Sequence, residues 1–373
     1  MVSSCYGNVH HPTATNSSTE RPPGVTLCRR KTAPTTPETQ PNSMPCIRDT
    51  YKSKGLSETS IAIIMNSWRD KTKKQYHVYI NKWERFCTDN GLSFISPKVK
   101  DVVHFLENLF TKGLSYSVLN TARSAISSWV NLEDSTLSVG NHPTISRFMR
   151  GAFNMHPALP RYVQTWDVSV VLNYLKSLSP TENLSLKQLT FKLVMLMALM
   201  SGQRAQCLQL LNVKNVSRTA DTVYFSIDQL VKQTRPGFHI QPIVFKAYPH
   251  DPDLCVVKTL DLYLEHSQKI RNGDTNNLFI SFQRPFKAVA TETISRWLKV
   301  VLKSARIDTG KFKGHSVRSA STSAAFQAGV SVQTIMNAAG WSSDCTFNKF
   351  YNKKASPGSF SEGILKSASN ANH

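Results

Sequence analysis

The sequence predicts a mainly α-helical protein with a small β component, folded as two domains. Three observations favour this architecture. Residues 67–156 carry four successive apolar stripes at helical spacing, a proline-rich break follows at residues 156–161, and strand-like runs come only later, near residues 222 and 239. A chain of 373 residues with 40% hydrophobic residues is long and apolar enough to build two cores.

The N-terminal segment, residues 1–54, is predicted to be a disordered tail. Residues 1–50 hold seven of the 18 prolines and 14 Ser or Thr residues, and they show almost no apolar periodicity. A basic triplet at residues 29–31 is interpreted as solvated, because it is too short to be a convincing nuclear signal.

Residues 55–157 are predicted to form a compact bundle of four amphipathic helices. The apolar stripes cover residues 76–86, 99–110, 118–129 and 145–153, and Pro97, Gly113 and Pro143 fall between or at the ends of them. Four such helices in sequence are typical of a helical bundle, in which each stripe faces the core.

The polar faces of these helices are basic, which allows two interpretations. A run of charges is ordinarily a solvated face, but here no acidic run balances it, so a surface that contacts phosphates is weighed equally. The candidate phosphate-binding residues are Arg69, Lys71, Lys73, Lys74, Arg123, Arg147 and Arg150, with Arg161 in the linker.

The net charge of +21 lies mostly outside the tail, with +6 in residues 51–158 and +13 in residues 159–373. Such a charge favours a polyanionic partner, usually nucleic acid. No apolar run reaches the length of a membrane span, and there is no secretion signal, so no membrane association is expected. The seven cysteines are scattered without a CxxC pair, which argues against a disulfide framework or zinc ribbon and favours a reducing, intracellular compartment.

Residues 158–356 are predicted to form a second, mixed domain, followed by a C-terminal tail at residues 357–373. Helices are expected from residue 167, at 186–200, 291–304, 318–327 and 332–338, and at about 346–351. Strands are expected at 222–227 and 239–245, with at most a short one at 278–280. The Pro236-Gly237 turn between the first two predicts a hairpin with Lys232 near its tip.

Four local clusters in this domain carry groups suited to chemistry. Arg204 ends an apolar helix, Lys232 lies on the hairpin, and His315 and Arg318 form an HxxR pair. Trp341 and Tyr351 come last. Taken singly, none of these residues is informative, because a lone Arg is usually an ion-pair residue and such a Tyr is usually part of the core. In this order, however, the six residues resemble the tyrosine recombinase (phage integrase) family, whose pattern is Arg, hairpin Lys, HxxR, His or Trp, and Tyr.

The resemblance spans residues 55–357 and implies a fold and a partner. It implies a helical, SAM-like core-binding domain joined to a mixed α/β tyrosine-recombinase catalytic domain. The partner is double-stranded DNA, bound as a dimer at each site and as a homotetramer in recombination, with no cofactor and no metal. The strings SGQRAQ at residues 201–206 and SWR at 67–69 look most like the recombinases of eukaryotic DIRS-type and related mobile elements, which implies a nuclear location.

The resemblance also implies roles at a scissile phosphate. Arg204 and Arg318 would clamp two non-bridging oxygens as fork-shaped donors, and Trp341 would donate through its indole N–H. The phenol of Tyr351 would attack phosphorus and leave a 3′-phosphotyrosine. A base and an acid complete the set: His315 would share the phenol proton, and Lys232 would protonate the departing 5′ oxygen.

Three positions depart from the common family pattern. Cys207 stands where many members have an acidic residue that orients its neighbours, and Trp341 stands where most have His. The spacing from Trp341 to Tyr351 is ten residues, one longer than is usual. We expect the extra residue to be absorbed at residues 342–345, and Tyr351 to remain the nucleophile because its neighbour Phe350 has no hydroxyl.

Other functions share these features. A type IB topoisomerase uses the same residue types and covalent intermediate, although the separate helical domain favours recombination. A DNA-binding protein derived from a recombinase that has lost catalysis is a third reading, against which all six positions hold chemically competent side chains. A purely structural basic protein gives no reason for the ordered set.

Overall fold

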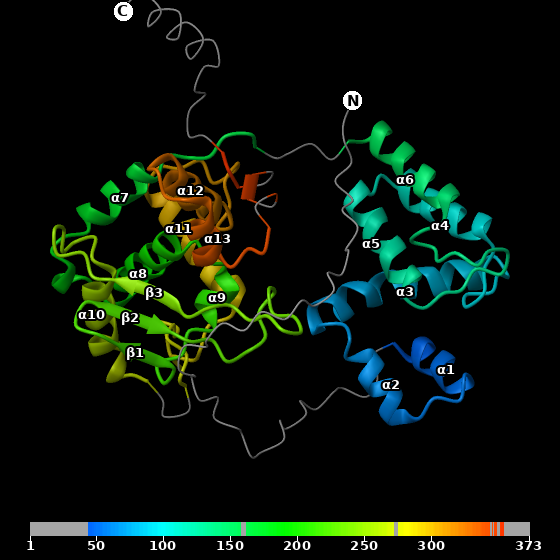
Figure 1. The fold of residues 1–373 in the computed structure, drawn as a ribbon, viewed down its shortest axis with the longest axis horizontal. Helices are drawn as coiled ribbons and strands as arrows, with labels where there is room; N and C mark the ends of the chain where they lie inside the picture. The colour runs from blue at the N-terminus through cyan, green and yellow to red at the C-terminus, as the bar shows by residue number, and fades with distance from the viewer. Residues whose placement is uncertain are drawn as a thin grey trace, which may run out of the picture. The chain divides into compact units, whose positions relative to one another are not determined.

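Two units make up the protein, and the chain passes from one to the other after residue 158, beside the boundary predicted at residue 157 (Figure 1). The computed structural model describes residues 44–157, 162–271, 275–343, 345, 347–348 and 351–353. Within those residues, no helix combines the length and the apolar composition that a membrane span needs.

The first unit is helical. Its helices are α1 (Pro45–Ser53), α2 (Glu58–Met65), α3 (Asp70–Asp89), α4 (Val99–Thr111), α5 (Tyr116–Ser127) and α6 (Pro143–Met155). The four predicted stripes are α3 to α6, and their apolar faces meet in one core around Trp83 and Phe105, whose rings pack edge to face at 5.2 Å. Trp83 is fully buried, and its indole N–H donates to the Phe94 carbonyl at 2.9 Å.

The predicted disordered tail is wrong at its end, because residues 45–53 form α1. Met44 and Ile47 are buried in the core of the first unit, so tertiary packing orders a segment that is too short to show periodicity. Glu58 at the start of α2 pairs with Arg48 and Lys52 of α1, which joins the two helices. Residues 1–43 and 357–373, predicted as tails, lie outside the described residues.

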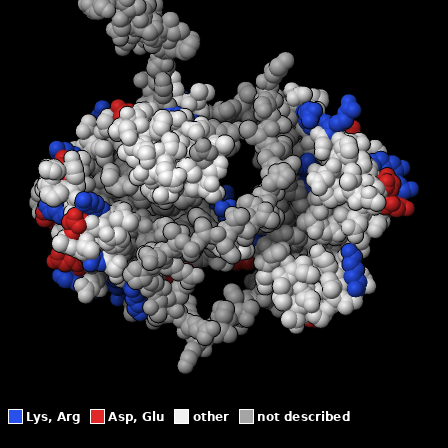
Figure 2. All heavy atoms as spheres, in the orientation of Figure 1, with Lys and Arg blue, Asp and Glu red and all other residues white. Residues whose placement is uncertain are grey.

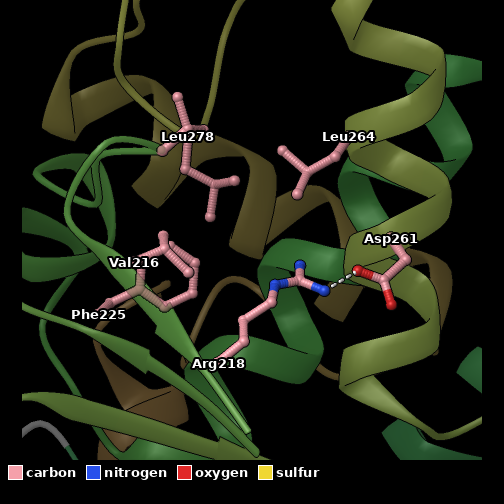
Figure 3. Close-up of a pocket in the computed structure, with 7 residues that line it drawn as sticks. Val216, Arg218, Phe225, Asp261, Leu264 and Leu278 are labelled. Atoms are coloured by element: carbon pink, nitrogen blue, oxygen red, sulfur yellow. Dashed lines mark hydrogen bonds and ion pairs between the residues drawn. The ribbon is translucent and has the colours of Figure 1, made fainter. Parts of the chain in front are cut away.

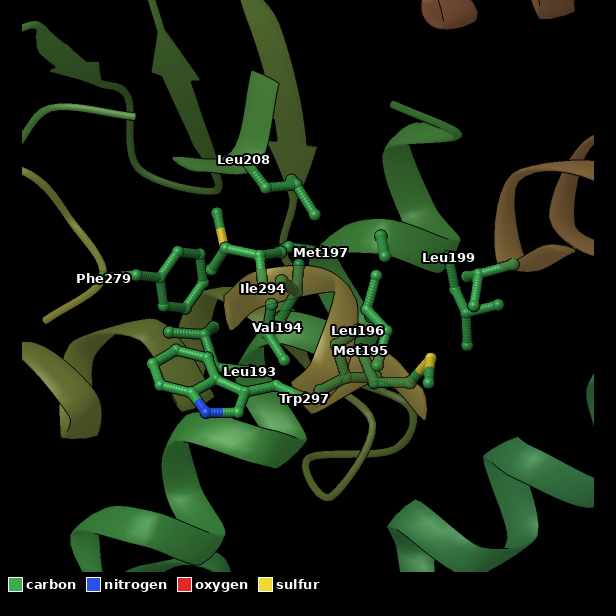
Figure 4. Packing of buried hydrophobic residues seen from close by; sticks show 14 of the residues in the cluster. Leu193, Val194, Met195, Leu196, Met197, Leu199, Leu208, Phe279, Ile294 and Trp297 are labelled. Atoms are coloured by element: carbon green, nitrogen blue, oxygen red, sulfur yellow. The ribbon is translucent and has the colours of Figure 1, made fainter. Parts of the chain in front are cut away.

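The second unit surrounds one buried helix. Its elements are α7 (Val168–Ser177), the 3-10 helix η1 (Thr181–Asn183), α8 (Leu186–Ser201), α9 (Ala205–Gln209), β1 (Val216–Arg218), β2 (Thr222–Phe225), β3 (Ile243–Lys246), α10 (Val256–Gln268), α11 (Thr291–Ser304), α12 (Ser316–Gln327) and α13 (Val332–Ala339). Helix α8 packs against α10, α11, α12 and β3. Figure 4 shows its side chains enclosed by Leu208, Phe279, Ile294 and Trp297.

Helix α8 is fixed at both ends and on all sides. A capping box of Ser185 and Gln188 begins it, and Gly202 ends it in a left-handed conformation with φ of +58°. Residues 193–199 are all buried, as in a helix that is apolar all round. Lys192 is also buried, and its ammonium donates to the Leu178 carbonyl and the Thr181 hydroxyl at 2.9 and 2.8 Å. The turn that follows Gly202 is therefore held rigidly.

The sheet is small and antiparallel, in the order β1-β2-β3. Strands β2 and β3 confirm the predicted hairpin, although β3 begins only at Ile243, after Pro242, which has no N–H to donate to a ladder. The segment at 278–280 makes an isolated bridge from Ile280 to Ala288 and no strand. Strand β1 and helix α10 were not predicted, although the spacing of Val256, Leu260 and Tyr263 in α10 carries a helical signal.

A close approach between α11 and the turn before α12 gives a stability prediction. A Cβ at Gly314 would lie 2.6 Å from the backbone carbonyl oxygen of Ser295. Gly314→Ala is therefore expected to destabilise the protein by about 1–3 kcal/mol, as overpacking does. Gly151, in the middle of α6, has no atom within 4 Å of its Cβ position, so Gly151→Ala is expected to stabilise by about 0.5–1 kcal/mol. Scanning calorimetry measures both, and a Gly314→Ala protein that melts no lower than wild type would contradict the first.

Candidate active site

The six candidate catalytic residues come from five separate segments of the second unit. Arg204 is the N-cap of α9, His315 is the N-cap of α12, and Arg318 lies in the first turn of that helix. Trp341 follows Gly340, which ends α13, and Tyr351 lies in the turn beyond. Lys232 is on the β2–β3 loop. The helix predicted at 346–351 is described only in part, with Phe347 and Asn348 helical.

Arg318 lies at the centre of this group. Its side chain is 2% exposed, and its two Nη atoms donate to the carbonyls of Gly202 at 2.6 Å and Ala339 at 2.8 Å. These bonds tie α12 to the turn after α8 and to the end of α13. Burial first, and then the nearby charge of Arg204, lower the pKa of Arg318 from 12.5 to about 9. The guanidinium is still protonated at neutral pH, but its charge is poorly solvated.

Trp341 and Tyr351 stack beside this guanidinium. The Cζ of Arg318 lies 4.2 Å from the centre of the Trp341 ring and 5.5 Å from that of Tyr351. The centres of the two aromatic rings lie 4.6 Å apart, and the ring of Phe347 lies 5.6 Å from that of Trp341. The additional residue between Trp341 and Tyr351 therefore does not keep them apart.

His315 and Tyr351 form a hydrogen-bonded pair. The imidazole Nε2 lies 3.2 Å from the phenol oxygen. The pKa of His315 is lowered from 6.5, first by burial and then by the positive charges of Arg318, Arg204 and Lys232. The imidazole is therefore neutral at neutral pH, and when Nε2 carries no proton it accepts the phenol proton.

Three buried donors in this group have no acceptor. They are Nη1 of Arg204, Nε of Arg318 and Nε1 of Trp341. Buried donors without partners are rare in native proteins, and each costs roughly 1–3 kcal/mol. A cavity of about 40 Å³ lies between Arg204, His315 and Arg318. Arg204 and Arg318 line this cavity and Trp341 does not, so an anion with several oxygens bound there would first satisfy the two arginine donors.

Lys232 lies on the β2–β3 loop, whose conformation is fixed by hydrogen bonds to His239. The imidazole of His239 bridges the loop, with Nε2 2.6 Å from the Ile227 carbonyl and Nδ1 2.8 Å from the Thr234 hydroxyl. Lys232 itself is exposed and makes no hydrogen bond or ion pair with any described residue. The next residue, Gln233, approaches Gly340, where a Cβ would lie 3.1 Å from its amide nitrogen. The loop thus places the lysine near the group without bonding it.

Cys207 occupies the position at which an acidic residue is common in the family that the sequence resembles. It is fully buried, and burial raises the pKa of its thiol, so the thiol is neutral. In the part of the chain that the structure describes, neither Arg204 nor Arg318 forms an ion pair. Among the described residues, no carboxylate therefore pairs with the positive charge of the two guanidinium groups.

The candidate phosphate-binding residues of the first unit lie on three helices. Exposed members are Arg69, Lys71 and Lys74 at the start of α3, and Arg147 and Arg150 on α6. Figure 2 shows basic side chains at the upper edge of the first unit, where α6 lies. Arg123 on α5 is half-buried, and Arg161 lies outside the described residues.

Lys73 differs from the expected solvated face. Its side chain is buried, and its ammonium donates to the Asn66 side chain at 2.7 Å and lies 3.9 Å from the Asp70 carboxylate. It is therefore a structural residue at the α2–α3 junction, and the interpretation of Lys73 as a phosphate ligand is withdrawn.

A second cavity lies between the sheet and α10 and contains none of the candidate residues. It has a volume of about 310 Å³ and apolar walls that include Val216, Phe225 and Leu278. Figure 3 shows Arg218 and Asp261 paired at one side of it, at 2.5 Å. Near α10, at the left edge of Figure 2, basic and acidic side chains alternate, so this edge has balanced charge.

Several side chains that support the group were not predicted. Gln203 donates to the Ala338 carbonyl at 2.6 Å, and the indole of Trp166 donates to the Ser316 hydroxyl at 2.9 Å. Both contacts join residues more than a hundred positions apart, so no local spacing reveals them. The sequence indicated these regions only through residues that neighbour Gln203 and Ser316, namely Arg204 and the start of α12.

Comparison with known proteins identifies the fold. No family model and no curated protein matches the sequence. Among solved structures, the chain is similar to the XerH site-specific recombinase bound to palindromic difH substrate in a post-cleavage complex. The TM-score is 0.54 at 13% identity, over 81% of this chain and 80% of that one.

Two further structures agree. One is the pre-cleavage complex of XerH with difH substrate, with a TM-score of 0.53 at 15% identity, over 80% of this chain and 78% of that one. The other is the Tn1549 transposon integrase in complex with transposon right end DNA, with a TM-score of 0.51 at 13% identity, over 87% of this chain and 99% of that one. This chain therefore has the tyrosine recombinase fold, as predicted.

Proposed function

We propose that this protein is a site-specific DNA recombinase that breaks and rejoins strands through a 3′-phosphotyrosyl intermediate. The observation that carries the proposal is the set of three buried, unpartnered donors on Arg204, Arg318 and Trp341 beside the Tyr351–His315 pair. The fold supports it, since the similar solved structures are recombinases and an integrase bound to DNA or substrate.

The scissile phosphate is the anion that these donors would accept. Two guanidinium groups would bind its non-bridging oxygens as charge-assisted donors, and the indole N–H of Trp341 would add a third contact. Because the pKa of Arg318 is depressed by burial and by Arg204, a bound anion would stabilise a guanidinium charge that the protein itself solvates poorly. These donors are fixed before the reaction, so they need little reorganisation as charge develops.

The reaction in this site is a transesterification. The Tyr351 oxygen forms a bond to phosphorus while the bond from phosphorus to the 5′ oxygen breaks. The phenol proton passes to Nε2 of His315, and Lys232 gives a proton to the leaving 5′ oxygen. Attack by the 5′-hydroxyl of another strand reverses these steps and frees the tyrosine. The phosphodiester energy is conserved in the intermediate, so the scheme requires neither ATP nor a metal.

Binding of the duplex would rest on the basic surface. The exposed residues on α3 and α6, together with the high net charge, supply contacts to backbone phosphates. We propose a dimer on each site and a homotetramer in recombination. We also propose, from the strings at residues 67–69 and 201–206, that the protein serves a eukaryotic mobile element and acts in the nucleus.

The state of His315 predicts the pH dependence of cleavage. As a base, His315 must be neutral, so the cleavage rate at subsaturating DNA falls as pH decreases through the pKa of His315. Because that pKa is lowered, the midpoint should lie below 6.5. His315→Asn should be slow and should lack this acid limb. A rate that rises toward acidic pH in the wild-type protein would contradict the role of base.

A library experiment tests the function without knowledge of the target site. The protein is incubated, without metal or ATP, with random-sequence duplexes that carry a nick, which traps cleaved strands. DNA that resists denaturing washes is then recovered and sequenced. A recombinase enriches a defined sequence, a topoisomerase retains many sequences and relaxes supercoiled plasmid, and a catalytically silent DNA-binding protein retains none.

A further inference from the structure

The main chain around Tyr351 is held by hydroxyl groups that the proposed reaction does not use. Ser323 of α12 is fully buried, and its hydroxyl donates to the carbonyl of Tyr351 and accepts the N–H of Lys353 at 2.9 Å. Ser319 adds a second, longer donor to the same carbonyl at 3.3 Å. The N–H of Tyr351 bonds to the Phe347 carbonyl at 2.8 Å. Both sides of the Tyr351 peptide unit are therefore fixed.

A second anchor lies two residues beyond the tyrosine. The ammonium of Lys353 donates to the Tyr162 carbonyl at 2.8 Å and lies 4.2 Å from the centre of the Tyr162 ring. That ring packs edge to face on Phe312 at 5.1 Å. Tyr162, which follows the linker, thus fixes Lys353, while Ser323 fixes the peptide unit of Tyr351.

Helix α12 carries both of the residues that are proposed to act with the phenol of Tyr351, namely His315 and Arg318. His315 is its N-cap, Arg318 lies in its first turn, and it presents Ser319 and Ser323 to the Tyr351 carbonyl. The start of the helix is itself held by the bond from Trp166 to Ser316. A displacement of the Tyr351 backbone relative to this helix would directly change the separation of the phenol from His315 and from the phosphate clamp.

We propose that Ser323 is a positioning residue, which with Lys353 forms a latch that sets the phenol of Tyr351 against His315. The proposal rests on the proposed function, in which that phenol is the nucleophile. Reacting groups must be held close to attack geometry, and a misplacement of about 1 Å costs roughly 10²-fold in rate. Without the hydroxyl, the Tyr351 carbonyl and the Lys353 N–H lose their partner, and the segment samples positions away from His315.

The first test measures adduct formation in a single turnover with saturating DNA recovered by the library experiment. Ser323→Ala should lower the rate roughly 10- to 100-fold while the DNA dissociation constant stays near wild type. The melting temperature should fall only modestly, because Ser319 still donates to the Tyr351 carbonyl. Lys353→Met, which keeps the aliphatic stem, should also lower the rate. Ser321→Ala is the matched control, because among the described residues the Ser321 hydroxyl bonds only to the Arg318 carbonyl of its own helix. Equal rates for Ser323→Ala and Ser321→Ala would overturn the proposal.

The second test needs no DNA and separates the latch from the proposed function. Hydrogen exchange is followed by mass spectrometry on a peptide that covers residues 347–353. Ser323→Ala should speed exchange there, since the Lys353 amide loses its acceptor, whereas Ser321→Ala should not. Unchanged exchange in Ser323→Ala would overturn the latch. If the wild-type protein forms no adduct, the proposed function is refuted. The exchange result alone then shows whether the latch exists. Lys353 is partly exposed, so Lys353→Met answers the question if Ser323→Ala folds poorly.

Discussion

Replacing Tyr351 by Phe is expected to abolish the covalent protein–DNA adduct while leaving DNA affinity unchanged. The change removes only the phenol oxygen, so the ring keeps its packing against Trp341 at 4.6 Å and its place near Arg318. No other hydroxyl is bonded to His315 in the part of the chain that the structure describes. The adduct is measured on denaturing gels with a nicked duplex.

A matched change elsewhere controls for this experiment. Tyr248→Phe removes the hydroxyl of a half-exposed tyrosine on the loop after β3, which is not one of the candidate residues. It should form adduct at the wild-type rate. If adduct survives in Tyr351→Phe, another group is the nucleophile and the proposed chemistry is wrong in its central step.

The second large effect is expected at Arg204. Removing a preorganised donor to a developing charge costs about 10²- to 10³-fold in rate, or about 3–4 kcal/mol. The side chain of Arg204 makes no hydrogen bond to any described residue, and its charge opposes that of Arg318, since it helps to lower the pKa of Arg318. Arg204→Ala should therefore cut adduct formation by this factor and leave the melting temperature equal to or above that of wild type.

Arg318→Ala should behave differently, because Arg318 has a structural role as well. It donates to the Gly202 and Ala339 carbonyls, so its removal orphans two backbone acceptors and opens a cavity. Both the rate and the melting temperature should fall. Arg218→Ala, which breaks a partly exposed ion pair with Asp261, is the control and should change neither much. An Arg204→Ala protein that cleaves as fast as Arg218→Ala would contradict the phosphate clamp.

The order of the six candidate residues was readable from the sequence because it is set by short, local features. A glycine cap before Arg204, a Pro-Gly turn after Lys232 and an HxxR pair at a helix start are all local. Their convergence was implied only by the resemblance, since nothing in the spacing brings Arg204 within reach of Arg318. The fold supplies that proximity through α8, which places the Gly202 carbonyl against α12.

The features that were missed depend on long-range packing. Helix α1 is ordered by burial of Met44 and Ile47, and the tail-like composition around it gave no sign of this. Lys73 resembles any other basic residue of α3 in sequence, but in the fold it is buried and its ammonium bonds to the Asn66 side chain. Ser323 lies in a helix of small residues, and nothing in the sequence around it indicates a special role. Its hydroxyl bonds to the carbonyl of Tyr351, 28 residues later in the chain, and no local pattern predicts that contact.

Identification of the modified residue is the most direct test of the proposed function. Trypsin cleaves after Lys349 and Lys353 and so releases Tyr351 on the peptide Phe350-Tyr351-Asn352-Lys353, in which it is the only tyrosine. After nuclease digestion of the trapped adduct, mass spectrometry should find this peptide with a 3′-linked nucleotide on the phenol. A nucleotide on any other residue, or none on any peptide from protein that binds the enriched DNA, would contradict the assignment of Tyr351 as the nucleophile.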